Sequence, residues 1–169
     1  MTQDKLDITR ATEAIKDIRF VEALGLLESN LAKDPNHIDS LYLAAVCSRY
    51  LKNYDDSKKY IESLLSQAPD MGRAYQELGH LNRDMGNGEN AIAHYRQACE
   101  LNPALLASWK ALYDYFKRNK NKPAADHAFM QMNTLQSIPS ILLYISQILN
   151  EGKLGIAEEK CREFLKKNP

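Results

Sequence analysis

Apolar and small residues recur at intervals of three and four positions along most of the 169 residues, the spacing that places them on one face of a helix. In segment 72–105, the first half carries Tyr75 and Leu78 and the second half carries Tyr95. Between the two halves, Met85–Gly88 contains residues that end helices or accept left-handed backbone. The pattern predicts two antiparallel helices joined by a short turn.

The hydrophobic pattern repeats, and the prolines give its period. Pro35, Pro69 and Pro103 are each 34 residues apart, and Pro169 closes two further units. Proline cannot extend the helix that precedes it, so each proline marks a break between hairpins. We therefore expect one array of five units. Their predicted bounds are 4–37, 38–71, 72–105, 106–137 and 138–169, the fourth unit being two residues short.

The third unit resembles a tetratricopeptide repeat. The family's aromatic, Leu-Gly, Gly, Ala, aromatic, Ala and Pro positions are filled by Tyr75, Leu78, Gly79, Gly86, Ala91, Tyr95, Ala98 and Pro103. The resemblance implies an all-α, right-handed superhelical solenoid of about five helical hairpins. It also implies a concave groove, lined by the first helix of each hairpin, in which a scaffold protein holds a peptide or a partner segment.

The two ends of the chain depart from the repeat. The first helix of unit one has Asp7 and Arg10 where apolar residues belong, as expected for a terminal repeat whose outer face meets water. No polar capping helix follows Phe164 and Leu165. We therefore expect either that the chain is a fragment of a longer protein or that it forms a homodimer through its C-terminal hairpin.

A narrower resemblance suggests an alternative function. Segments 41–48, 72–79, 99–111 and 150–169 are similar to the repeat arrays that precede a sulfotransferase domain in some bacterial proteins. That resemblance implies a targeting or substrate-presenting arm of a larger enzyme whose catalytic domain is absent from this chain. The sequence itself contains no glycine-rich strand-to-helix loop that would bind a phosphosulfate donor.

Composition narrows the classes of partner. Lys plus Arg and Asp plus Glu number 22 each, so no net charge favours nucleic acid or an anionic membrane surface. The longest apolar stretch, 141–145, is far shorter than the roughly 18 to 20 residues that cross a bilayer, and the N-terminus lacks the order of a signal peptide. We expect a cytoplasmic protein whose three cysteines are structural.

Candidate catalytic and metal-binding residues are few. His37, His80, His94 and His127 have no second ligand at metal-binding spacing, and no cysteine has an adjacent base. We expect His94 and His127 to lie on the solvent side of their helices. We therefore predict a protein that is not an enzyme and has no catalytic residue, metal or cofactor. Only His80 falls at a position that faces the groove in relatives.

The groove positions of the three central units carry the one legible site. Of fifteen such positions, six hold Arg or Lys and three hold Asp, which favours an acidic or carboxylate-bearing ligand. The alternative is that they are ordinary solvated residues. The predicted partner-binding residues are Tyr42, Arg49, Arg73, Gln76, His80, Arg83, Lys110, Asp114 and Lys117.

Some relatives hold chaperone C-termini with Lys and Asn side chains on successive first helices. Here the corresponding pairs are Tyr42 with Val46, Gln76 with His80, and Lys110 with Asp114. This departure argues against a chaperone cofactor of that type.

Overall fold

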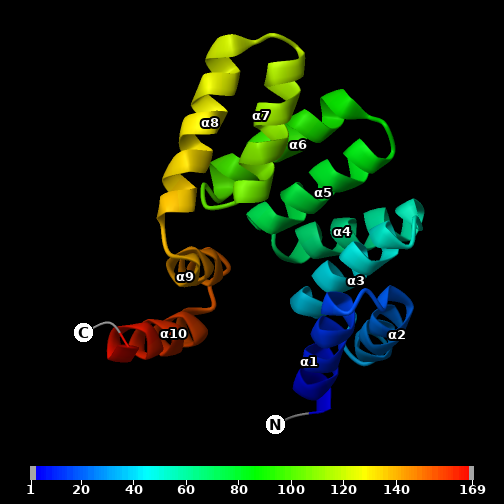
Figure 1. Cartoon of the computed structure of the whole chain (residues 1–169). Helices are drawn as coiled ribbons and strands as arrows, with labels where there is room; N and C mark the ends of the chain where they lie inside the picture. Colours follow the sequence, from blue (N-terminus) through cyan, green and yellow to red (C-terminus); the bar gives the residue numbers. More distant parts are fainter. Residues whose placement is uncertain (1–2, 168–169) are drawn as a thin grey trace. The chain divides into compact units, whose positions relative to one another are not determined.

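The structure is a computed structural model that describes the backbone of residues 3–167 and the side chains of residues 7–167. Within that range the chain forms ten α-helices and no strand (Figure 1). The helices are α1 (Gln3–Lys16), α2 (Phe20–Leu31), α3 (Ile38–Tyr50), α4 (Tyr54–Gln67), α5 (Gly72–Asp84), α6 (Gly88–Leu101), α7 (Leu106–Arg118), α8 (Lys122–Ser137), α9 (Ser140–Asn150) and α10 (Leu154–Lys167). The prediction of an all-α fold of successive helices is confirmed.

Consecutive helices pair as hairpins. Contacts join α1 to α2, α3 to α4, α7 to α8 and α9 to α10, while α5 meets α6 at Gly79 and Tyr95. Helices α3, α5 and α7 begin at residues 38, 72 and 106, where the 34-residue period begins a new unit. The grouping of all five hairpins into one array stays a prediction.

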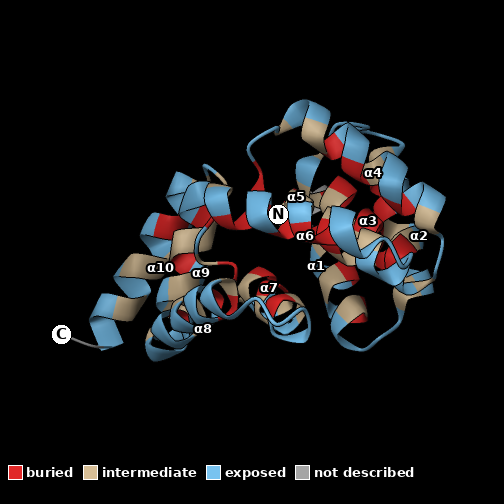
Figure 2. Cartoon of the chain, turned by 90° about the horizontal axis from the view of Figure 1, so that it is seen from above, coloured by how far each residue is buried: buried red, intermediate tan, exposed pale blue. Residues whose placement is uncertain are grey.

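The chain divides into two compact units, a first and a second, each larger than one of the predicted repeats. The first comprises the residues up to Asp70 together with His80–Ala91, and the second comprises Met71–Gly79 together with the residues from Ile92 onward. Helices α5 and α6 therefore contribute residues to both units. Figure 2 shows that buried residues alternate with exposed ones along the helices. No helix in the described range is long and apolar enough to cross a membrane.

One left-handed residue ends the first helix of every hairpin. The residues with positive φ among those described are Ile18, Lys52, Gly86, Lys120 and Gly152, at intervals of 34, 34, 34 and 32. At the second hairpin, the N–H of Lys52 donates to the carbonyl of Arg49, and the N–H of Asn53 donates to that of Ser48. This pair of bonds is the Schellman motif, which satisfies helix-end carbonyls while the chain reverses direction. The corresponding bonds recur at the other four turns.

Small residues set the distance between paired helices in the second unit. A Cβ atom added to Gly79 would lie 2.5 Å from the ring of Tyr95, which is only 1% exposed. Ala98 is fully buried on the same helix, and a Cβ added to Gly72 would lie 3.1 Å from its carbonyl oxygen. Because the interior is close-packed, neither contact has room for a larger side chain.

The first helix departs from the sequence prediction at one position. Arg10 is exposed as expected, but Asp7 is 8% exposed instead of facing water. Helix α1 packs against both α2 and α3, so this face of the terminal helix is covered by its neighbours. Asp7 Oδ2 lies 4.0 Å from Lys33 Nζ, which supplies an opposite charge to the enclosed carboxylate.

Replacing Ala98 with Leu should lower the free energy of unfolding by about 1 to 3 kcal/mol, because the larger side chain overpacks a filled contact. Ala93→Leu is the matched control, since Ala93 is exposed on the same helix and the change in helix propensity is the same. Urea titration followed by circular dichroism measures both. Equal stability of the two variants would contradict the packing described for α6.

Candidate partner-binding site

The predicted groove residues lie on three first helices and belong to two units. Tyr42 and Arg49 lie on α3, four of the residues on α5, and the remaining three on α7. Tyr42, Arg49, His80 and Arg83 belong to the first unit. The second unit contains Arg73, Gln76, Lys110, Asp114 and Lys117.

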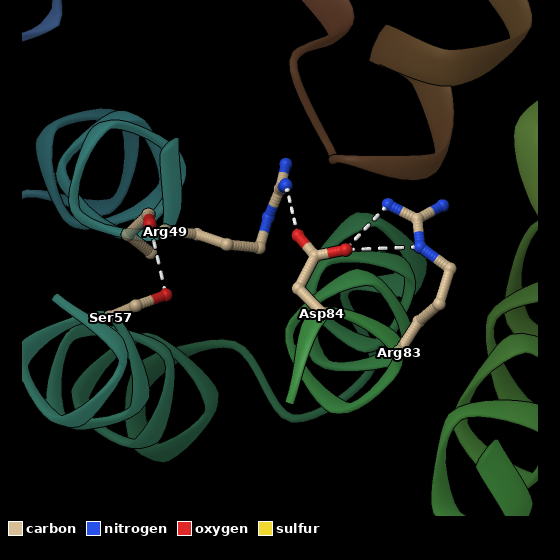
Figure 3. Close-up of polar contacts among 5 residues, drawn as sticks. Arg49, Ser57, Arg83 and Asp84 are labelled. Carbon is tan, nitrogen blue, oxygen red and sulfur yellow. Dashed lines mark hydrogen bonds and ion pairs between the residues drawn. The ribbon is translucent and has the colours of Figure 1, made fainter. Parts of the chain in front are cut away.

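A charged cluster in the first unit joins the C-terminal ends of α3 and α5. Arg49 Nη1 donates to Asp84 Oδ2 at 2.8 Å, and Arg83 donates to the other oxygen of the same carboxylate at 2.9 Å from Nη2 and 3.1 Å from Nε (Figure 3). The side chain of Arg49 is 6% exposed and that of Asp84 is 25% exposed, so this ion pair is partly shielded from solvent. Burial favours the neutral form of Asp84, but hydrogen bonds from Arg49 and Arg83 outweigh it and hold its pKa below the ordinary value.

The cluster borders a hollow of about 540 Å³. Its walls also contain aromatic rings: the Arg49 guanidinium lies 4.5 Å from the ring centroid of Tyr50, which stacks on Phe20 at 4.4 Å. Three permanent cations and one carboxylate line the hollow, so its charge is positive although the chain as a whole is neutral. The lining residues are Arg49, Tyr50, Lys52, Tyr54, His80, Arg83 and Asp84.

His80 is neutral in this hollow at neutral pH. Burial, together with the positive charges of Arg49 and Arg83, lowers its pKa to about 4 against the opposing effect of Asp84. An uncharged imidazole offers both a hydrogen-bond donor and an acceptor. The hollow therefore combines fixed cations, aromatic rings and a neutral polar group.

In the second unit, Arg73 forms an ion pair with Glu151. Its Nη1 lies 3.0 Å from Glu151 Oε1, and Lys153 Nζ lies 3.0 Å from Oε2 of the same carboxylate. With its amide oxygen turned toward Arg73, Gln147 accepts from Nε at 2.9 Å and from Nη1 at 3.1 Å. The Glu151 side chain is only 6% exposed. The contact joins α5 to the end of α9, and its two residues are 78 positions apart in the sequence.

The pKa of Glu151 is lowered by this cluster. Burial alone would raise it, but the charges and hydrogen bonds of Arg73 and Lys153 outweigh burial and favour the carboxylate. Glu151 also caps the C-terminus of α9 and precedes Gly152, the left-handed residue of its hairpin. The cluster therefore fixes the turn between α9 and α10 against α5.

The other predicted residues of the second unit are less enclosed. Gln76 Oε1 accepts a hydrogen bond from Ser108 Oγ at 3.0 Å. Lys110, Asp114 and Lys117 are exposed on α7, where the ammonium of Lys117 lies 5.3 Å from the ring centroid of Tyr113.

Four residues of the hollow were absent from the predicted set, namely Tyr50, Lys52, Tyr54 and Asp84. So were Gln147, Glu151 and Lys153 of the Arg73 cluster. Tyr50 and Asp84 hold groove positions of the repeat, whereas Lys52, Tyr54 and Glu151 do not. Lys52 lies in the turn after α3, Tyr54 begins α4, and Glu151 lies in the turn after α9. The repeat pattern assigns the groove to five positions within each first helix, and these three residues fall outside those positions. The turn between the two helices of each hairpin could have indicated these residues, because a side chain in such a turn lies close to the end of a first helix.

The structure places the remaining candidates separately. Among residues 7–167, no three His, Cys, Asp or Glu side chains lie close enough together to hold a metal ion. His127 is exposed, as predicted, whereas His94 is half-buried and burial lowers its pKa. Cys47 and Cys99 are buried free thiols, and Cys161 is half-buried.

Glu151→Gln should lower the free energy of unfolding by about 2 kcal/mol, because it leaves a partly buried arginine without its counter-charge. The folded pKa of Glu151 is below its ordinary 4.5, so the stabilisation is complete above that pH and is lost as pH falls through the folded pKa. Thermal unfolding between pH 3 and 7 should therefore show a steeper acid loss in the parent than in the variant.

The control for that experiment is Glu158→Gln, which removes an exposed carboxylate paired with Arg162 on α10. Its effect should stay within about 0.5 kcal/mol. If both variants lose the same stability and the same pH dependence, the Arg73 contact does not hold α9 against α5.

Comparisons with known proteins identify the family of the chain. Two family models, both described as tetratricopeptide repeat, match residues 14–80 and 72–105. The MamA protein from residue 41 to its end, from Desulfovibrio magneticus RS-1, aligns with a TM-score of 0.66 and 19% identity over 79% of this chain and 76% of that one. Another MamA structure aligns at 0.63 and 18% identity over 96% of this chain and 88% of that chain.

A third similar structure is part of an enzyme. The K341M mutant of the Thermobaculum terrenum O-GlcNAc transferase aligns with a TM-score of 0.61 and 20% identity, over 69% of this chain and 23% of that chain. Comparison with curated protein sequences gives no significant match. The family models together span residues 14–105, more than half of the chain, and the solved structures share its helical-repeat fold. The chain belongs to the tetratricopeptide repeat family.

Proposed function

We propose that this protein is an interaction scaffold that holds a segment of a partner protein through an acidic side chain. The observation that carries the proposal is the positive hollow of the first unit, where Arg49, Lys52 and Arg83 face a single carboxylate. In a chain without net charge, this local excess would attract and orient an anionic group.

The hollow is suited to this role because its cations are already positioned. Asp84 fixes Arg49 and Arg83 by hydrogen bonds, so a ligand would meet side chains that have already lost much of their conformational freedom. Charge-assisted hydrogen bonds from guanidinium to carboxylate are short and geometrically specific. The rings of Tyr50 and Tyr54 add apolar contact area beside the charges.

The ion pairs within the chain change which of the predicted residues we expect to bind an anionic ligand. The sequence favours joint action of Arg73, Arg83, Lys110 and Lys117, but the charge of Arg73 is met by Glu151 within the chain. Arg83 and Lys52 border the hollow and are exposed, so we expect them to contribute most to an anionic ligand. Lys110 and Lys117 on α7 stay candidates for further contacts.

Replacing Lys52 and Arg83 together by Glu should weaken binding of an acidic peptide at least about tenfold, because two attractive charges become repulsive. The probe is a fluorescein-labelled octapeptide of alternating glutamate and glycine, followed by fluorescence anisotropy. Circular dichroism should show unchanged helicity, since neither side chain lies in the core. Affinity should also fall with added salt.

The matched control replaces Lys58 and Lys59 by Glu, which makes the same change in net charge on exposed positions of α4. Its affinity for the peptide should stay within about twofold of the parent. Equal weakening by both double variants would mean that the peptide responds to overall charge, and the hollow would not be its site.

A second candidate function is the targeting or substrate-presenting arm of a larger enzyme. The observation that favours it is the alignment of this chain with only 23% of the O-GlcNAc transferase, whose remaining length lies outside the match. A sulfotransferase-like catalytic domain is one version of this hypothesis. The mass of the native protein, detected in its own cells with an antibody against this chain, separates an arm from a free scaffold.

We also propose a homodimer through the C-terminal hairpin, because apolar side chains on α10 are exposed: Leu154 by 68%, Ile156 by 46% and Leu165 by 62%. Leu165→Glu should convert a sedimenting dimer into a monomer, since it places a charge in an apolar contact. A parent chain that sediments as a monomer at high concentration would rule the dimer out.

A further inference from the structure

The second unit contains a hollow that the groove hypothesis does not use. It has a volume of about 310 Å³ and lies among α6, α7 and α8. Trp109 and Phe116 of α7 face the small side chains of Ala124 and Ala128 on α8. Elsewhere in this unit a glycine meets a large ring with no space left, as at Gly79. The hollow is therefore a local feature of small residues opposite large rings.

The aromatic wall of the hollow is held in place. Trp109 Nε1 donates to the carbonyl of Pro103 at 2.9 Å, and the ring of His127 contacts Trp109 edge-on at a centroid distance of 5.5 Å. The buried thiol of Cys99 also lines the hollow, and burial raises its pKa to about 12, so it stays uncharged. An aromatic ring would meet apolar surfaces whose positions are set before it binds.

The rim of the hollow carries two opposite charges. Arg96 and Glu100 lie one turn apart on α6 and are both exposed. The Arg96 guanidinium lies 5.2 Å from the ring centroid of Phe116. The rim can therefore contact one acidic and one basic group of a ligand.

We propose that this hollow is a second binding site of the scaffold, which receives an aromatic side chain of a partner protein flanked by an acidic and a basic residue. The ring enters between Trp109 and Phe116 and fills the space above Ala124 and Ala128. The acidic neighbour contacts Arg96 and the basic neighbour contacts Glu100. The site goes beyond the positive hollow of the first unit, which selects for negative charge and not for a ring.

The chain provides its own reporter, because Trp109 is its single tryptophan. The probes are two capped tripeptides, N-acetyl-aspartyl-phenylalanyl-lysine amide and the same peptide with its charged residues exchanged. Both are added to the whole chain while tryptophan emission is followed with excitation at 295 nm. We expect a saturable change in emission with at least one of them, with a Kd on the order of 1 mM for so small a ligand.

Three comparisons test the proposal. The alanine analogue of the better tripeptide should give no saturable change. Ala128→Leu should abolish binding by filling the hollow, and Ala124→Leu serves the same purpose if the first variant fails to fold. Arg96→Gln should weaken binding about threefold to tenfold without touching the core, whereas Arg162→Gln on α10 should leave it unchanged.

The proposal is overturned if neither tripeptide changes the emission of Trp109, or if the alanine analogue does so equally. It is also overturned if binding survives both filling variants in folded protein. None of these results depends on the acidic octapeptide, because the tripeptides carry no net charge. Failure of the positive hollow in the first unit is thus distinguished from failure here.

Discussion

Reversal of the chain at one left-handed residue per hairpin is the constraint on which the rest of this fold depends. Ile18, Lys52, Gly86, Lys120 and Gly152 end the first helix of each pair with the same two backbone hydrogen bonds. The second helix can then return along the first and bury their shared apolar stripe. Because the first four turns are each 34 residues apart, residues at equivalent positions recur at the same end of these first helices, where the positive hollow forms.

Four of these turns contain residues that tolerate positive φ or end helices, as the sequence indicates for Met85–Gly88. Gly86 and Gly152 adopt this backbone at no steric cost, and Lys52 and Lys120 lie beside asparagines in recognisable turn segments. Ile18 gave no such signal. A β-branched residue is disfavoured at positive φ, so tertiary contacts of the first hairpin must override its local preference. The hydrophobic periodicity predicted the helices because it indicates which residues share one face of a helix. It missed this turn because it carries no information about backbone strain.

The partner-binding role of the predicted residues stays a prediction, and the sequence did not show how their side chains pair. Position within the repeat explains why Arg49, His80 and Arg83 line one hollow, because equivalent positions on neighbouring first helices lie close together. It did not show that Asp84 would bind both arginines, nor that Arg73 would reach an acid 78 residues away. Those partners depend on the path of the chain between hairpins, and the fourth repeat is two residues shorter than the 34-residue period. Counting charges along the sequence therefore overestimates the cations that face a ligand.

The bond between Arg73 and Glu151 changes how stability is shared within the second unit. In a helical repeat each hairpin usually contacts only its neighbours, so stability is close to a sum of local terms and the ends can fray independently. Here a residue of α5 contacts the turn after α9, and α6, α7 and α8 lie between the two helices in sequence. Loss of the last hairpin would expose a charge on α5. Unfolding of this unit should accordingly be more cooperative than a nearest-neighbour chain of the same length allows.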